Sequence, residues 1–202
     1  MMLLRPARAE DAGAIAAIYA PYVTHTAVSF EAAPPSADEI AARIAKAQAG
    51  WAWLVCEDAG QVGAYAYAGA FAERACYRWS TTVSVYAGPG QQRRGLGRAL
   101  YTSLLGLLAQ QGFHSAFAGI TLPNAGSVSL HQALGFEPAG CFAEAGHKLG
   151  AWHDVAWFRR GLQPPGPAQP TLAPADTRCL AEVLATPAGA AALAAGQALL
   201  PA

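Results

Sequence analysis

The sequence predicts one mixed α+β domain, in which a mostly antiparallel central sheet is flanked by helices, followed by a Pro- and Ala-rich C-terminal extension. Two helix-like segments come first, and strand-like segments follow with turn residues between them. Strands and helices then alternate up to about residue 162, which is typical of an α+β domain. From Gln163 the chain reads Gln-Pro-Pro-Gly-Pro-Ala-Gln-Pro, which neither a helix nor a sheet accommodates. We therefore expect a domain over residues 1–162 and an extension over residues 163–202.

The helices are predicted from apolar spacing and from residues that start or stop a helix. Glu10–Ala20 has apolar residues three and four positions apart, and we expect this helix to end before Pro21. Ser36-Ala37-Asp38-Glu39 is a capping box that opens a second helix. Further helices are expected over residues 95–111 and 127–134. Residues 176–199 either form two short helices with a break at Pro187 or stay partly disordered.

The strands are predicted where β-branched and aromatic residues run between turn residues. A turn at Asp58-Ala59-Gly60 joins two of them, and two more close the domain. The expected strands are Leu3–Pro6, Trp51–Cys56, Gln61–Phe71, Trp79–Ala87, Ser115–Ile120, Phe142–Lys148 and His153–Arg160.

Composition narrows the class of protein. The formal net charge is +0 and only 13% of the residues are charged, so neither nucleic acid nor a membrane surface is an expected partner. No apolar run reaches the roughly 20 residues of a membrane span, and the N-terminus lacks the apolar core of a signal peptide. The cysteines and histidines lack metal-ligand spacing, so we expect no metal site. We interpret the four cysteines as free thiols in a reducing cytoplasm, with a disulfide as the alternative.

One loop carries recognisable chemistry. After the strand that ends at Ala87, arginines precede the first turn of a helix that contains Gly95 and Gly97. Glycines let a phosphate approach the free amides of a helix start, and arginines add charge-assisted hydrogen bonds. The pattern indicates a pyrophosphate site, with a solvated basic helix cap as the alternative. It is neither a Walker A loop, which needs Gly-Lys-Ser/Thr, nor a Rossmann loop, since Arg93 stands at the third glycine.

Two segments of the chain resemble the cofactor site of the GNAT superfamily of N-acetyltransferases. Gln92-Arg93-Arg94-Gly95-Leu96-Gly97 resembles its Q/R-x-x-G-x-G/A acetyl-CoA loop, and the segment from Asn124 to Phe136 resembles the second half of that site. Other segments, over a resemblance that runs from Leu4 to Leu162, are similar to the phosphinothricin acetyltransferase branch. They are Tyr65–Ala68, Tyr77–Trp79, Leu100–Leu105, Gln111–Phe113, Leu122–Asn124 and Gly150–Val155.

This resemblance implies a GNAT fold, a homodimer and an enzyme that moves an acetyl group from acetyl-CoA to a small amino-acid-like amine of the phosphinothricin or methionine sulfoximine type. The backbone of Val85, Tyr86 and Ala87 would pair with the pantetheine arm, and the amide near Val85 would polarise the thioester carbonyl. The remaining cofactor residues that it implies are Gln92, Arg93, Arg94, Gly95, Leu96, Gly97, Arg98 and Asn124.

The resemblance also implies catalytic roles, and at one catalytic position this sequence differs from the branch. Asn124 would contact the cofactor, or else cap a helix. His131 would protonate the leaving thiolate, unless it is an ordinary core histidine. Thr82 stands where the branch has a glutamate as general base, and a threonine does not accept a proton at neutral pH. Either another acid such as Glu31 replaces it, or the amine needs no base, or the chain is a catalytically weakened acyl-CoA-binding module.

Three residues match positions that line the acceptor pocket in that branch: Phe30, Arg74 and Tyr77. Arg74 would pair with a carboxylate or phosphinate of the substrate, and its alternative is a surface arginine on a loop. Acetylation of protein N-termini or lysines is a third reading, which a pocket built by Arg74 and Tyr77 disfavours. The sequence shows no chemistry in the extension.

Overall fold

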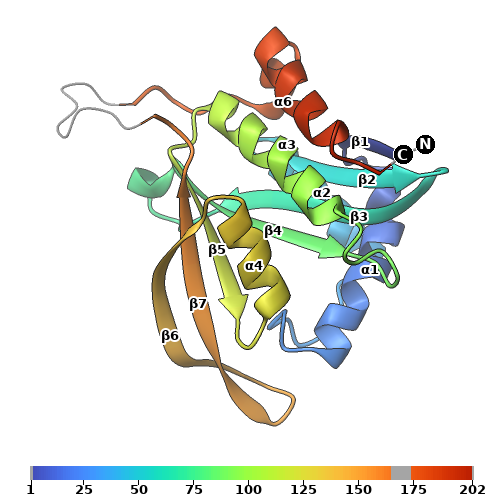
Figure 1. Ribbon diagram of the computed structural model, residues 1–202, viewed down its shortest axis with the longest axis vertical. Helices are drawn as coiled ribbons and strands as arrows, with labels where there is room; N and C mark the ends of the chain where they lie inside the picture. Colours follow the sequence, from blue (N-terminus) through green and yellow to red (C-terminus); the bar gives the residue numbers. More distant parts are fainter. Residues whose placement is uncertain (1, 165–173, 202) are drawn as a thin grey trace.

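A computed structural model describes residues 2–164 and 174–201 of the chain. Its described strands form a seven-stranded sheet in the order β1-β2-β3-β4-β5-β7-β6 (Figure 1). β4 and β5 pair in parallel, whereas the other neighbouring strands in this part of the chain pair antiparallel. The predicted mixed, mostly antiparallel sheet is confirmed. The strands are β1 (Met2–Pro6), β2 (Trp53–Asp58), β3 (Gln61–Ala70), β4 (Ser80–Ala87), β5 (Ser115–Thr121), β6 (Glu137–Lys148) and β7 (Ala151–Gly161).

Helices cover both faces of the sheet. One apolar core lies between the sheet and α1 and α2, and a second lies beneath α3 and α4. The side chains of β3 divide between these cores, because alternate residues of a strand point to opposite faces. Tyr65 packs toward α1 and α2, whereas Ala64 and Ala66 pack toward α3. The helices are α1 (Ala12–His25), α2 (Ala37–Gln48), α3 (Leu96–Gln111), α4 (Ala125–Ala133), α5 (Leu180–Leu184) and α6 (Pro187–Gln197).

α1 is longer than the sequence predicts. The expectation that it ends before Pro21 is wrong, since the helix continues through this proline to His25. Proline removes one backbone donor from a helix, but the residues that follow it make tertiary contacts. Val23 is buried, and the Tyr22 hydroxyl donates a hydrogen bond to the Ala87 carbonyl at 2.7 Å. These contacts hold the last turn of α1 against the end of β4.

The capping box predicted at Ser36 is confirmed. Its hydroxyl oxygen accepts from the Glu39 amide at 3.2 Å, and the Glu39 carboxylate accepts from the Ser36 amide at 2.7 Å. β6, in contrast, begins at Glu137 rather than at Phe142. The sequence hides this early start because Pro138 and Gly140 are poor strand residues, and the register with β7 shifts between them.

The described part of the extension packs on the domain. α6 lies along α3, as Figure 1 shows, and the predicted break is confirmed, with Pro187 as the first residue of α6. The Ser103 hydroxyl of α3 donates to the Leu193 carbonyl at 2.7 Å and accepts from the Gly196 amide at 3.2 Å. The Gln197 side chain bonds the edge strand β1, accepting from an amide and donating to a carbonyl. Residues 165–170 of the predicted Pro-rich linker lie outside the described residues.

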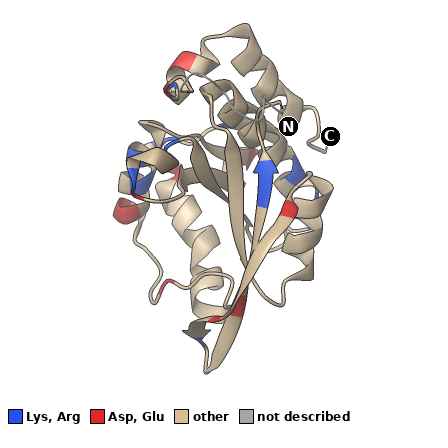
Figure 2. Ribbon diagram, turned by 90° about the vertical axis from the view of Figure 1, so that its left-hand side faces the viewer, with Lys and Arg blue, Asp and Glu red and all other residues tan. Residues whose placement is uncertain are grey.

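The charge distribution agrees with the sparse composition. Figure 2 shows a ribbon that is mostly free of charged residues on the side facing the viewer. All four cysteines are free. Across residues 2–164 and 174–201, no helix has the length and apolar character to span a membrane.

We predict that Gly196→Val lowers the melting temperature. A Cβ at this position would overlap the Ala99 carbonyl oxygen and the Ser103 hydroxyl. Forced overpacking of this kind costs about 1–3 kcal/mol, which is roughly 2–12 °C for a domain of this size. Gly140→Val is the matched control, since nothing lies within 4 Å of its Cβ position. Equal melting temperatures of the two variants in a thermal scan would contradict the observed packing of α6 on α3.

Candidate active site

The candidate site begins where β4 and β5 separate. Their parallel pairing covers three residue pairs and ends at Thr82 and Phe117, although β4 continues to Ala87 and β5 to Thr121. The gap between the diverging halves is lined by residues of both strands and of α4, and by Val28 from the loop after α1. A sheet that opens in this way leaves backbone groups of β4 without a strand partner on one side.

Val85 presents such groups. The Gly88 amide donates to the Gly63 carbonyl on β3 at 2.8 Å, so Gly88 faces β3. Because consecutive residues of an antiparallel strand alternate in the direction of their amide and carbonyl groups, Val85 and Ala87 face the other way, toward β5. The Ala87 carbonyl accepts from the Tyr22 hydroxyl and from the Gln92 side chain. The amide and carbonyl of Val85 therefore point into the gap.

The free end of α3 lies beside the same end of β4. Gly95 precedes the helix with a φ of 84°, a left-handed conformation that glycine adopts without strain. The first helical hydrogen bond runs from the Ala99 amide to the Gly95 carbonyl, so the amides of residues 96–98 have no partner within the helix. This helix start has the features of an anion site, namely free amides and the positive end of the helix dipole.

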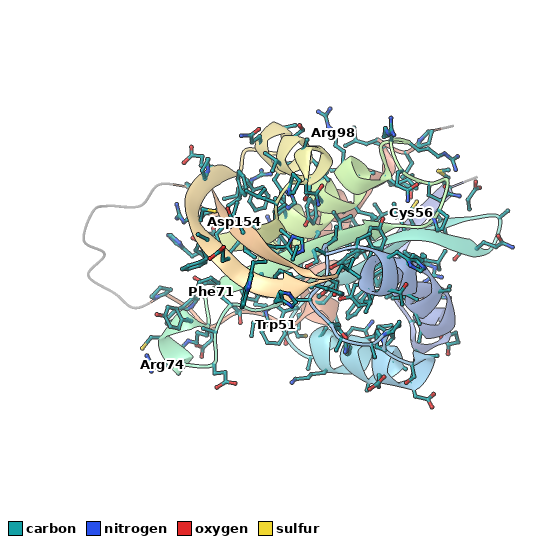
Figure 3. All side chains as sticks on the ribbon, turned by 90° about the horizontal axis from the view of Figure 1, so that it is seen from below. Trp51, Cys56, Phe71, Arg74, Arg98 and Asp154 are labelled. Carbon is teal, nitrogen blue, oxygen red and sulfur yellow. The ribbon has the colours of Figure 1, made fainter. Side chains whose placement is uncertain are left out.

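The arginines predicted at this helix start are all exposed. Arg93 lies in the loop with a φ of 60°, and Arg94 bonds the Gln91 side chain. Figure 3 shows Arg98 reaching outward beside α3 and α4. Three exposed cations and three amides without a helical partner are thus gathered around the start of α3, where a Cβ at Gly97 would lie 3.8 Å from the Val85 Cγ2.

Three other predicted cofactor residues have structural roles in this part of the fold. Leu96 is buried in the core under α3. Gln92 ties the loop to β4 through the hydrogen bond from its Nε2 to the Ala87 carbonyl, at 3.2 Å. The Tyr86 ring packs against the rings of Tyr19 and Tyr22 on the α1 face, so only the backbone of Tyr86 lies in the strand that borders the gap.

Asn124 and His131 both line the gap from the α4 side. The Asn124 Oδ1 accepts from the Ser127 amide at 3.1 Å, so this residue is the N-cap of α4. This bond uses one of its two side-chain groups, and the amide nitrogen remains a potential donor toward the gap.

His131 is buried, with both ring nitrogens engaged. Its Nδ1 donates to the Ser127 carbonyl at 2.8 Å, so in the neutral ring Nε2 is the acceptor, and the Tyr101 hydroxyl donates to it at 3.2 Å. Burial lowers the pKa of His131, because the charged imidazolium is poorly solvated there. Tyr101 also lines the gap, and sequence reasoning missed it because its position on α3 reads as core.

Thr82 lies at the last paired position of β4, on the sheet face that α1 and α2 cover. Its Oγ1 lies 3.4 Å from both the Gly69 and the Ala70 carbonyl oxygens. Glu31, the acid suggested as a replacement base, bonds the Arg43 guanidinium at 2.6 and 3.0 Å and accepts from the Tyr19 hydroxyl. Arg43 lowers the pKa of the Glu31 carboxyl, so Glu31 is a weaker base than a free glutamate.

The predicted acceptor residues do not meet at one point. Phe30 lies against the β6–β7 hairpin, where its ring contacts His153 and occupies the space that a side chain at Gly146 would need. Lys148 of the hairpin fixes this loop by donating to the Ser29 and Glu31 carbonyls. Arg74 is exposed, and Figure 3 shows it pointing outward, away from the sheet.

Tyr77 connects to the site through aromatic residues that the sequence analysis did not single out. Its ring contacts Phe71 at 5.6 Å, and Phe71 contacts Phe117 at 4.4 Å. Phe117 is the strand partner of Thr82, so this aromatic row ends beside Thr82, the position where the resemblance implies a base in the relatives. Its members are spread over three segments, and only the fold brings them together.

Comparison with known proteins decides the family. A family model described as an acetyltransferase (GNAT) domain matches residues 4–157. The chain belongs to the GNAT acetyltransferase family. Its fold is the GNAT fold, and the predicted resemblance is confirmed.

Among individual GNAT proteins, the chain is 40% identical over 167 residues to a phosphinothricin N-acetyltransferase of Streptomyces viridochromogenes, covering 83% of this chain and 91% of that one. It is 34% identical to an L-methionine sulfoximine/L-methionine sulfone acetyltransferase of Salmonella typhimurium, over 80% of this chain and 95% of that one. A solved phosphinothricin acetyltransferase from Sinorhizobium meliloti in complex with acetyl-CoA matches with a TM-score of 0.81 and 34% identity, over 89% of this chain and 98% of that one.

We predict that Gly97→Asp abolishes acetyl-CoA binding. The substitution puts a carboxylate in the first turn of α3, among the amides that would face the pyrophosphate, and two like charges repel. Gly97→Ala is the control, because its Cβ meets the tip of Leu130 at 3.2 Å, which can shift, and the Val85 Cγ2 at 3.8 Å, an ordinary van der Waals contact. Isothermal calorimetry measures both variants. An affinity of Gly97→Asp equal to that of Gly97→Ala would mean that the phosphates bind elsewhere.

Proposed function

We propose that this acetyltransferase moves the acetyl group of acetyl-CoA to the amino group of a small amino-acid-like substrate. The observation that carries the proposal is the gap between β4 and β5, which has the free backbone of Val85 along one side and the open start of α3 at one end. The relatives named above act on phosphinothricin and on methionine sulfoximine, which favours an acceptor of that size and type.

The residues at the gap fit acetyl-CoA. Val85 supplies its amide and carbonyl to the pantetheine arm, and Ala87 supplies only its amide, because its carbonyl already accepts from Tyr22 and Gln92. Residues 96–98 supply amides for the pyrophosphate. Arg93, Arg94 and Arg98 add positive charge at that end. The bound cofactor supplies an activated acetyl group. The Val85 amide is positioned to polarise the thioester carbonyl, which stabilises the negative charge that develops on its oxygen.

His131 is our candidate for the residue that donates a proton to the leaving thiolate. Its ring lies in the wall of the gap, and the lowered pKa makes its protonated form a stronger acid than a free imidazolium. To donate from Nε2, the ring must be protonated there and the Tyr101 hydroxyl must turn away. The Ser127 carbonyl keeps the proton of the neutral ring on Nδ1, and Tyr101 holds the ring by its hydrogen bond to Nε2.

The chain has no carboxylate at the position of the family base. Thr82 does not remove the ammonium proton, and the ion pair with Arg43 weakens Glu31 as a substitute. We propose that the acceptor reaches the site as a free amine or loses its proton through water. The alternative function, a weakened acyl-CoA-binding module, has the same cofactor contacts but no turnover.

We also propose that the protein is a cytoplasmic homodimer. Large apolar side chains are exposed along the β6–β7 hairpin, namely Phe142, Leu149 and Trp152, each 62% exposed. Exposed apolar residues gathered on one element are typical of an interface. The four free cysteines agree with a reducing compartment. A sedimentation mass equal to one 20.8 kDa chain would contradict the dimer.

Turnover tests the proposed function. The protein is incubated with acetyl-CoA and a panel of amines, including phosphinothricin and L-methionine sulfoximine, and thiol release is followed. We expect release with at least one amino-acid-like acceptor. Calorimetric binding of acetyl-CoA with no thiol release across the panel would replace the enzyme by the binding module.

We further predict that Thr82→Glu raises kcat/KM for the best acceptor. A carboxylate here would lie beside Phe117 at the mouth of the gap and could accept the ammonium proton. A general base contributes about 10²–10⁴-fold, so a gain of at least about tenfold is expected. Thr82→Gln, which has the same shape without the basic group, should show no gain. Equal rates for Thr82→Glu and the unmodified protein, with binding intact, would mean that another group already serves as base.

A further inference from the structure

A second cavity, of about 230 Å³, lies on the sheet face that α1 and α2 cover. α2 contributes Lys46 and Ala47, the turn before β2 contributes Trp51, and the strands contribute Trp53, Tyr67 and Gly69. Figure 3 labels Trp51. None of the cofactor, catalytic or acceptor residues that the family resemblance implies lines this cavity.

The cavity ends next to the point of transfer. Gly69 in its wall is the strand partner of Thr82, and the Thr82 hydroxyl oxygen lies 3.4 Å from the Gly69 carbonyl oxygen. Thr82 is also where the gap between β4 and β5 opens. An amino group held at Thr82 therefore has the cavity one strand away, within reach of the side chain of an amino acid.

The cavity wall is flat and aromatic. The rings of Trp53 and Tyr67 stack at 4.5 Å with an interplanar angle of 20°, and Tyr65 stacks beside them. Planar rings pack well on such a surface. An apolar cavity of about 150 Å³ holds one benzene molecule, so 230 Å³ admits one substituted ring.

The charge of the lining points to an anionic group at its mouth. Arg43 and Lys46 are the charged residues of the lining, and it contains no acid. Arg43 is paired with Glu31 at 2.6 Å, which offsets its charge, whereas Lys46 forms no ion pair with any residue in the described ranges. A carboxylate entering the cavity would therefore meet one free cation.

We propose that this cavity binds the side chain of an aromatic α-amino acid acceptor, with the ring against Trp53 and Tyr67 and the carboxylate toward Lys46. The inference rests on the proposed function and names its substrate class. A second anion on the side chain, as in phosphinothricin, is disfavoured inside the cavity, because desolvating it against aromatic walls is costly.

The test compares acceptors of different side chain in the full-length protein. With saturating acetyl-CoA, kcat/KM is measured for L-phenylalanine, L-methionine sulfoximine and phenethylamine, which lacks the carboxylate. We expect L-phenylalanine to exceed L-methionine sulfoximine at least about tenfold, since contacts in a fitted pocket discriminate by that factor or more. Binding of L-phenylalanine in the presence of CoA is measured separately by calorimetry.

Variants on α2 test whether the preference for L-phenylalanine arises in the cavity. Ala47→Phe fills the cavity and should lower kcat/KM for L-phenylalanine at least about tenfold. Ala45→Phe on the same helix is the matched control, because Ala45 is exposed and does not line the cavity. Lys46→Gln changes an exposed side chain, so it leaves folding intact. It should raise KM for L-phenylalanine about fivefold but not KM for phenethylamine.

The outcomes separate the two proposals. If L-methionine sulfoximine is acetylated while L-phenylalanine is neither acetylated nor bound, the cavity proposal is overturned and the proposed function stands. If no amine is acetylated, the proposed function fails. Calorimetric binding of L-phenylalanine then tests the cavity proposal by itself. Binding of L-phenylalanine that Ala47→Phe removes and Ala45→Phe retains supports it, and the absence of binding overturns it.

Discussion

The parallel ladder between β4 and β5 is three residue pairs long, and the arrangement of the site follows from where it ends. If the ladder continued, the groups of Val85 would be paired within the sheet and no strand edge would remain for a ligand. Because it ends at Thr82, the same point separates the backbone edge that suits a cofactor from the aromatic cavity that suits an acceptor. The two proposed binding regions thus meet at one residue.

The remaining structure holds the two sides of this gap in place. α3, whose first turn supplies the free amides, is fixed on its outer side by α6 through Ser103, and small residues let the two helices approach closely. A Cβ at Gly106 would lie 3.1 Å from the Cβ of Ala192. On the other side, Lys148 holds the loop that carries Val28 and Phe30. The extension is therefore packed against the same helix that begins at the proposed cofactor end of the gap.

The sequence predicted much of this fold, because capping residues, alternation and glycines are local signals. It failed at Pro21, where tertiary contacts of Val23 and Tyr22 outweigh a helix-breaking residue. The cofactor loop could be predicted because its residues are contiguous, and its role stays a prediction. Tyr101 and the aromatic walls of the cavity were missed for the opposite reason. The spacing of Trp51 and Trp53 predicts that both lie on one face of a strand. No local sequence signal shows that residues of β3 and α2 pack beside them.

Hydrogen exchange at backbone amides tests the central claim most directly. Exchange is measured by mass spectrometry with and without acetyl-CoA, at peptide resolution across the chain. The account predicts slower exchange in two separate places, the strand segment of residues 83–87 and the helix start of residues 95–98, because cofactor oxygens would accept from those amides. Unchanged exchange in both places, with protection appearing elsewhere on the sheet, would contradict it.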